Sequence, residues 1–338
     1  MLTTRGACRR CCWPHSAQLA LAVQHAHAQP NQGLVYFFGC GLNTQVRFAY
    51  CAPVLPGCER LASVEAMNIE AAISRLLSSE DVTIVHDARR TIAVRGKDAI
   101  KWLHNIVTAD VHNVPEGGQC YGLLLEKKGK IVSDFIFFRD QSGCLLSVPS
   151  PVFDQVFETF DRHIIMEDVE LSEHGVNTLV EQLMHPGLGP VPRGRASSRF
   201  GLADAAPGSA IPALSTQGVG LRALLGIPVF GLDFGTSEYP QEAGITEPAV
   251  SFSKGCYLGQ EVVYMLQMRG HATRNLRTVV ADEGIEGELF IDDKAVGQMR
   301  SLGKFEEQSL GFAMLKRAHQ TPATELRDAA GRHCSVLG

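Results

Sequence analysis

Short runs of β-branched residues, separated by polar turns and by helical stretches, begin at Asp81 and constrain the fold more than any other feature of the chain. Val82–Val85 and Thr91–Val94 predict two short strands. Gly96 then interrupts the strand pattern. The helix expected next has apolar residues at spacings of three and four, namely Ile100, Leu103, Ile106 and Val107.

The following segment continues the mixture of strands and helices. Residues 121–126 and 131–139 predict two strands, joined by the polar turn 127–130 that contains a glycine. Ser150-Pro151 predicts a helix start, with the serine as cap and the proline in the first turn. The resulting order, β-β-α-β-β-(β)-α-β, predicts an α+β fold rather than a doubly wound parallel sheet.

Two further regions complete the expected organisation. Residues 185–217 are rich in alanine, serine, glycine and proline, which predicts a surface loop or linker. From Leu276 the chain alternates short strands and turns, which predicts a compact β-barrel or sandwich over 276–338. The pattern near Gly338 shows little sign of a strand that closes such a barrel.

Composition excludes several classes of function. The formal net charge of −5 disfavours a general nucleic-acid binder, although a local basic groove remains compatible with it. No apolar stretch is long enough to cross a bilayer. Six of the ten cysteines precede Met67, and the four that follow it are too sparse for a disulfide framework. We therefore expect the body of the protein to work in a reducing compartment.

The first 66 residues differ from the rest, because no acidic residue occurs before Glu59. Three interpretations are open: a mitochondrial transit peptide, a metal site at Cys8-x-x-Cys11-Cys12 with His15, or an extension that is disordered or not part of the translated protein. We favour the third, with a start at Met67 and a first unit over 67–275 that includes the 185–217 linker. No metal ligand set is expected elsewhere.

The segment 254–261 concentrates the candidate chemistry, and it follows Val250-Ser251-Phe252, which predicts a short strand. Lys254 lies two residues before Cys256, and a neighbouring cation favours the thiolate, which is the reactive form of cysteine. Gln260 and Glu261 offer an amide and a carboxylate to the edge of a heterocycle. From these residues alone the segment is a candidate ligand or thiol site, since a lone cysteine is more often a small buried hydrophobe.

As a string, K-G-C-Y-x-G-Q-E at 254–261 resembles the signature of the YgfZ-type folate-binding proteins, a family that includes mitochondrial iron–sulfur assembly factors. Five further stretches resemble this family: Ile92–Ala99, Gly129–Asp134, Gly226–Pro228, Val296-Gly297 and Leu310–Ala313. The last two are similar to the terminal barrel of the glycine-cleavage aminomethyltransferase, the T-protein.

The resemblance implies a GcvT-like body of two α+β modules around a central tetrahydrofolate site, followed by a small β-barrel. It implies an accessory role for [4Fe–4S] enzymes, with an indirect effect on tRNA thiolation, and Cys256 as the functional cysteine. The expected partners are folate and iron–sulfur client or assembly proteins, with no direct nucleic acid and no membrane. The expected location is the bacterial cytoplasm, or the mitochondrial matrix if residues 1–66 are a transit peptide.

A folate-dependent aminomethyl- or methyltransferase is the alternative. T-protein relatives carry an R-x-E-A-G element, and here Leu224 stands in place of its glutamate, which weakens the enzyme. Asp134 matches one of two paired acidic positions, whereas Ser133 replaces the other. The stretch 239–244 resembles the P-x-E-A-G segment of the enzyme and favours it.

The sequence therefore gives a specific set of candidate residues. The functional centre is expected at Cys256 and Lys254, and the residues expected to contact tetrahydrofolate are Tyr257, Gln260, Glu261, Asp134 and Arg222. A basic stretch after the signature has two interpretations: contacts to a folate tail or a phosphate, or a solvated connector. That stretch comprises Arg269, His271, Arg274 and Arg277.

Overall fold

The computed structural model describes residues 82–183, 194–195 and 198–337. The predictions for residues 1–66, and for the segment that follows Met67, lie outside the described residues. In the described part, no helix is both long enough and apolar enough to cross a membrane.

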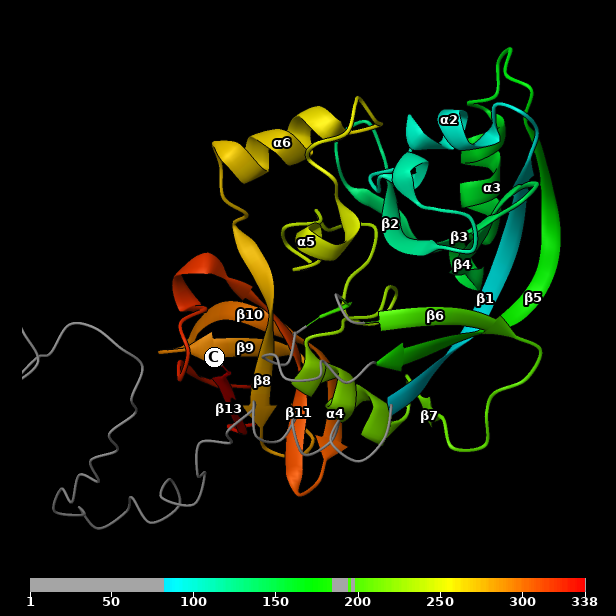
Figure 1. Ribbon diagram of the computed structural model, residues 1–338. Coiled ribbons are helices and arrows are strands. Elements are labelled where there is room, and N and C mark those ends of the chain that lie inside the picture. The colour runs from blue at the N-terminus through cyan, green and yellow to red at the C-terminus, as the bar shows by residue number, and fades with distance from the viewer. Residues whose placement is uncertain (1–81, 184–193, 196–197, 338) are drawn as a thin grey trace, which may run out of the picture. The chain divides into compact units, whose positions relative to one another are not determined.

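The described elements mix strands and helices along the chain (Figure 1). The strands are β1 (Val82–Arg95), β2 (Gln119–Leu125), β3 (Ile131–Asp140), β4 (Gly143–Pro149), β5 (Glu170–Leu183), β6 (Ser198–Ala203), β7 (Ile211–Pro212), β8 (Arg274–Ala281), β9 (Glu288–Ile291), β10 (Lys294–Phe305), β11 (Gln308–Lys316), β12 (Glu325–Arg327) and β13 (His333–Val336). The α-helices are α2 (Ala99–His104), α3 (Phe153–Asp161), α4 (Thr216–Leu225), α5 (Thr246–Ala249) and α6 (Gln260–Met268). Short 3₁₀ helices are η1 (Val111–Asn113), η2 (Ser150–Val152) and η4 (Arg317–His319).

The first seven strands form one sheet, in the order β2-β3-β4-β1-β5-β6, with β7 parallel to β1. The two strands predicted at 82–85 and 91–94 are one continuous strand, β1. Its pairing with β5 shifts register between His86 and Arg89 and then continues, so the irregularity bends the ladder without ending it.

Helices cover one face of this sheet, and a long connecting segment covers the other. Trp102 and Leu103 of α2 pack with Phe160 of α3 in the first core. Alternate residues of β2 point to the opposite core, where Tyr121 contributes together with Tyr257 of the segment between α5 and α6. The sheet is therefore buried on both faces, and the signature segment belongs to its second core.

The last six strands form a closed barrel in the order β10-β11-β8-β13-β12-β9, so the predicted C-terminal barrel is confirmed. The expectation of a missing closing strand was wrong, because His333–Val336 pairs with both β8 and β12. Helix α4 packs on the barrel, and Leu221 and Leu224 share a core with Phe312 of β11. The α+β class is thereby confirmed.

Three local predictions need correction. Strand β6 lies inside the expected 185–217 linker, because its backbone completes the edge of the sheet against β5. Ser150 does not cap a helix: it lies in η2, and α3 begins at Phe153 without a side-chain cap. The strand expected over 250–252 is a bend after α5, since Val250 and Ser251 hydrogen-bond to Thr246 and Thr108 rather than to a strand.

Candidate functional site

The signature segment connects α5 to α6 and is fixed at its end by a close approach of two turns. Gly259 precedes α6 with φ of +80°, in the left-handed region. A Cβ at this position would lie 2.5 Å from the carbonyl oxygen of Glu126, and the Cα of Gly129 would be 3.0 Å away. The signature therefore packs against the β2–β3 turn, and only glycine allows that distance.

Lys254 fastens the middle of the segment to the end of α2. Its ammonium donates to three backbone carbonyl oxygens, those of His104, Val107 (2.6 Å) and Ala109 (3.0 Å). Burial lowers the pKa of Lys254 to about 8, and the carboxylate of Asp110 opposes this shift. All three ammonium protons are engaged, so in this conformation Lys254 holds the loop rather than offering a proton to Cys256.

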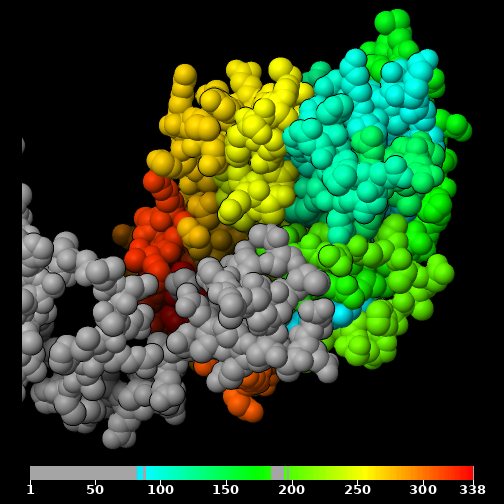
Figure 2. Space-filling view, in the orientation of Figure 1, coloured from blue at the N-terminus to red at the C-terminus, as the bar shows by residue number. Residues whose placement is uncertain are grey.

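Thr108 makes a second connection between the same two segments. Its hydroxyl donates to the carbonyl oxygen of Ala249 at 2.6 Å, and its own carbonyl accepts from the amide of Ser251 at 3.0 Å. Figure 2 shows the yellow region around α5 and α6 directly against the cyan to teal region that contains α2. The 104–109 segment thus forms a rigid support for the signature.

Cys256 is an exposed free thiol at the edge of an open hollow of about 480 Å³. The hollow has a mixed lining of apolar and polar side chains, contributed by Asn105, Ile106, His163, Cys256, Tyr257 and Leu258. Its volume lies within the range of small-molecule sites, although its mouth is wide. The sulfur is therefore accessible both to a small ligand and to a protein surface.

Tyr257 is buried beside the exposed cysteine. Its ring lies 5.2 Å from the ammonium of Lys254, which is within the range of a cation–π contact. Its hydroxyl is shielded from solvent and has no hydrogen-bond partner among the described residues. Burial raises the pKa of Tyr257 to about 12, so the phenol stays protonated and its donor is unused within the second core of the sheet.

The other two signature residues lie outside the lining of this hollow. Gln260 begins α6, and its side-chain amide is 3.5 Å from the carbonyl oxygen of Gly255. Glu261 is exposed in the first turn of the same helix. Beyond them α6 presents three apolar side chains to solvent, those of Tyr264, Met265 and Met268. The roles predicted for Gln260 and Glu261 stay predictions.

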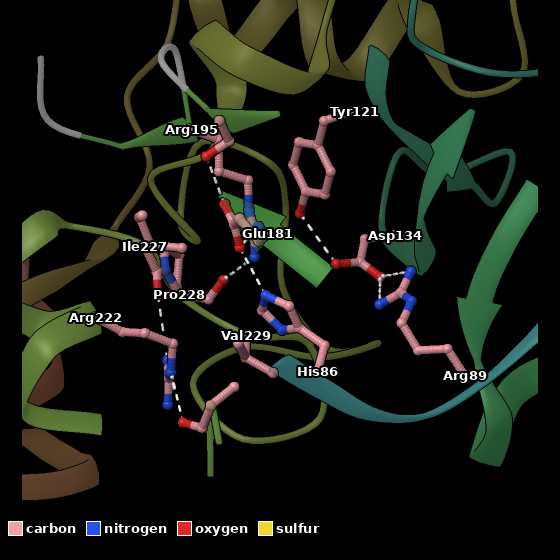
Figure 3. Close-up of polar contacts among 12 residues, drawn as sticks. His86, Arg89, Tyr121, Asp134, Glu181, Arg195, Arg222, Ile227, Pro228 and Val229 are labelled. Carbon is pink, nitrogen blue, oxygen red and sulfur yellow. Dashed lines mark hydrogen bonds and ion pairs between the residues drawn. The ribbon is translucent and has the colours of Figure 1, made fainter. Parts of the chain in front are cut away.

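Asp134 belongs to a buried polar cluster within the sheet (Figure 3). Its Oδ1 accepts from both terminal nitrogens of Arg89 at 3.2 Å, and its Oδ2 accepts from the hydroxyl of Tyr121 at 3.2 Å. Arg89 also donates to the hydroxyl and the carbonyl of Ser147. Asp134 is 2% exposed, so its carboxylate is already saturated by protein donors.

A second buried cluster centres on Glu181, also visible in Figure 3. Its Oε2 lies 2.6 Å from Arg195 Nη1 and 2.6 Å from His86 Nε2, and its Oε1 accepts from Ser198 at 2.5 Å. Burial alone would raise the pKa of Glu181, but Arg195 and the hydrogen bonds from His86 and Ser198 outweigh it and hold the pKa at about 2. Arg195 also stacks over Tyr121, 4.9 Å from the ring, which joins this cluster to that of Asp134.

Arg222 lies in the last turn of α4 and is fully buried. Its Nη1 donates to Asp233 at 2.7 Å and to the carbonyl of Ile227 at 3.2 Å, and its Nε donates to Ala213. Asp233 also accepts from the hydroxyl of Ser301 in the barrel. The structure does not bring Arg222 into contact with Asp134 or with the signature, and its side chain stabilises the joint between α4 and the barrel.

The sequence did not single out several residues that the structure places at these sites. Asn105 and His163 line the hollow but lie far from the signature in sequence, and nothing local marks them. Glu181 had a usable signal, because it follows Leu179 and Val180, and a carboxylate buried in such a strand requires a partner. The identity of that partner was not readable from the pattern. His86 and Arg89 had no such signal, because they lie in the polar stretch 86–90.

Among residues 82–337 as described, no group of three or more histidine, cysteine or acidic side chains is arranged to hold a metal ion. The four described cysteines are dispersed: Cys144 and Cys334 are buried and Cys120 is partly buried, whereas Cys256 is exposed. Burial raises the pKa of the Cys120, Cys144 and Cys334 thiols to about 12, so within the described chain Cys256 is the accessible one.

Comparison with known proteins finds relatives that this chain resembles in sequence and in fold. Residues 81–186 match the model of the GCVT N-terminal domain. The tRNA-modifying protein YgfZ of Sodalis glossinidius is 24% identical over 235 residues, which cover 60% of this chain and 70% of that protein. The mitochondrial iron–sulfur cluster assembly factor IBA57 homolog of Pyricularia oryzae is 25% identical over 264 residues, covering 69% and 66%.

The chain resembles the YgfZ-type proteins of the GcvT-like family. The fold agrees: the glycine cleavage system aminomethyltransferase T of Bartonella henselae superimposes with a TM-score of 0.62 at 15% identity, covering 79% of this chain and 88% of that one. The chain thus resembles the YgfZ-type proteins in sequence and shares the fold of an aminomethyltransferase.

Two residues that bear on aminomethyltransferase chemistry have structural contacts in this chain. Leu224, which stands where the enzyme's glutamate is expected, is fully buried against the barrel. Glu242, in the stretch resembling the enzyme's P-x-E-A-G segment, accepts from Arg274 at 3.2 Å and from the amide of Tyr239 at 3.1 Å. Neither residue offers a free carboxylate for a pterin in this conformation.

Proposed function

We propose that this chain is a tetrahydrofolate-binding accessory protein that supports the assembly or repair of [4Fe–4S] enzymes. An effect on tRNA modification would follow indirectly, through such enzymes. The observation that carries the proposal is the exposure of the Cys256 thiol at an open hollow beside an apolar helix face. A thiol in that position can meet the surface of another protein, whereas an enzyme that transfers a one-carbon unit needs to exclude water from its site.

The lining of the hollow is compatible with a flat heterocycle. Ile106 and Leu258 offer apolar surface to a ring, and Asn105 and His163 offer polar groups at its edge. Among the described residues no carboxylate lines the hollow, so a pterin bound there would be held by stacking and neutral hydrogen bonds. The relatives named as YgfZ and as an assembly factor support the biological setting, and the bacterial ones favour the cytoplasm.

The roles of this chain's residues follow from their contacts. Lys254 and Thr108 fix the signature on the 104–109 support, and Gly259 sets its exit into α6. Cys256 then presents its sulfur at a constant position, while the apolar side chains of α6 give a protein partner a surface to contact. Bound tetrahydrofolate would supply a reduced pterin with one-carbon chemistry at this place.

The test is rescue of a [4Fe–4S] enzyme in a strain lacking its native YgfZ-type protein, together with calorimetry of tetrahydrofolate binding. Cys256→Ala is expected to abolish rescue while leaving the fold and folate binding intact. Ser253→Ala is the matched control, since Ser253 is exposed in the same loop. Full rescue by Cys256→Ala would remove the thiol from the mechanism, and absence of folate binding at millimolar ligand would remove the cofactor.

The alternative is an aminomethyltransferase, favoured by the shared fold and by a 33% identity over 82 residues with the aminomethyltransferase of Rubrobacter xylanophilus. Incubation with a labelled aminomethyl donor and tetrahydrofolate separates the two functions. Multiple turnover would establish the transferase and contradict the accessory role as stated.

A further inference from the structure

A second hollow, of about 290 Å³, lies where the end of α6 and the segment after it face the barrel. Its lining contains three basic side chains, from His271, Arg277 and Arg317, and no acidic one. It shares no residue with the hollow beside Cys256. A function at this place is therefore independent of the folate proposal.

The arginines of this hollow differ from their neighbours in how they are paired. Arg274, three residues before Arg277, is neutralised by Glu238 and Glu242, and Arg300 also pairs with Glu238. Within the described part of the chain, neither Arg277 nor Arg317 forms an ion pair with a carboxylate. The basic stretch predicted from the sequence thus divides into an arginine used by the fold and one whose charge faces the hollow.

The unpaired guanidinium of Arg277 is held in position by a side-chain amide. Gln320 accepts from Arg277 Nη2 at 3.3 Å, and the amide nitrogen of Gln320 donates to the carbonyl oxygen of Leu315 at 2.7 Å. Asn275, on the same strand, is anchored to the carbonyl of Gln241 at 2.7 Å. The side chains of Arg277 and Asn275 are therefore oriented before a ligand arrives, which lowers the entropy lost on binding.

We propose that this hollow binds the phosphate group of a small phosphate ester. The hollow has two guanidinium groups, an imidazole and, among the described residues, no carboxylate in its lining. This set matches a multiply charged tetrahedral oxyanion, to which an arginine donates two parallel hydrogen bonds. The small volume accommodates a phosphate with a sugar-sized substituent rather than a long chain.

The experiment is a titration of the full chain with ribose 5-phosphate, inorganic phosphate and ribose, followed by NMR of the side-chain amides of Gln267, Asn275 and Gln320. Both phosphates are expected to shift these signals, and ribose is not. Tighter binding of the ester identifies a sugar phosphate as the natural source, whereas equal affinities identify the free anion. Both results support a phosphate site.

The variant Arg277→Gln/Arg317→Gln is expected to bind phosphate at least about tenfold more weakly, since hydrogen bonds to charged groups dominate such a site. Arg269→Gln is the matched control, because Arg269 is exposed and close in sequence but does not line the hollow. An equal loss in the control, or unshifted amides in the unmodified chain, would overturn the proposal. Saturation by a short RNA with no response to ribose 5-phosphate would overturn the assignment to a small ligand.

Discussion

Replacement of Lys254 by methionine tests whether this residue holds the signature loop or acts on the thiol. The methionine is unbranched and only one heavy atom shorter than the lysine, but it removes all three donors. The carbonyl oxygens of His104, Val107 and Ala109 then lose a charged partner. Charge-assisted hydrogen bonds are worth about 1.5–3 kcal/mol each at most, and partial access of water to this half-buried site reduces that to about 1 kcal/mol each.

The free energy of unfolding is therefore expected to fall by about 3 kcal/mol, or about 6–12 °C in melting temperature for a body of this size. Urea unfolding followed by circular dichroism measures the change. Lys128→Met is the control, because Lys128 is an exposed lysine in the β2–β3 turn. A Lys254→Met protein that is as stable as the control but inactive in iron–sulfur rescue would show that Lys254 does not hold the signature loop. It would favour the alternative, in which Lys254 acts on the Cys256 thiol.

Three other changes have defined outcomes. Gly259→Ala is expected to lower the free energy of unfolding by more than about 2 kcal/mol, because the backbone is left-handed there and the new methyl group meets the β2–β3 turn. Gly208→Ala is the control: a Cβ there meets no atom within 4 Å, so its free energy of unfolding is expected to change by no more than about 0.5 kcal/mol. The pKa of Glu181 is lowered on folding, so its contribution to the free energy of unfolding is present above about pH 4.5 and is lost as the pH falls toward 2. Glu181→Gln is therefore expected to flatten this part of an acid-unfolding curve. An unchanged curve would contradict the pairing of Glu181 with Arg195 and His86. Arg222→Met leaves Asp233 buried without its cation and is expected to lower the free energy of unfolding by about 3–5 kcal/mol. If Arg222 instead binds folate, the variant will melt as the unmodified chain does and bind folate more weakly.

The class of the fold was readable from the sequence because its signals are local. Short strand-like runs between polar turns identified β3 and several strands of the barrel, and the turn at 127–130 was placed correctly between β2 and β3. The failures involve long-range pairing. β6 has a loop-like composition and becomes a strand only because β5 offers it an edge, and β13 is four residues whose strand state depends on β8 and β12.

The site was predicted less completely, for a physical reason. The signature marks Cys256 and its neighbours as a contiguous string, but the other side of the hollow comes from residues 105, 106 and 163, which fold beside it from elsewhere. Chemical type also does not reveal whether a charged group is free. Arg222 and Asp134 carried suitable groups for a ligand, and the fold engages both with internal partners.

The contact between Gly129 and Gly259 has a consequence for exchanging parts between related proteins. A graft of the signature loop alone would bring a new surface against an old hairpin turn, with no side-chain flexibility available to absorb a mismatch of a few tenths of an ångström. The two segments are 130 positions apart in numbering yet form a single transplantable unit, so a working chimera has to carry both from the same donor.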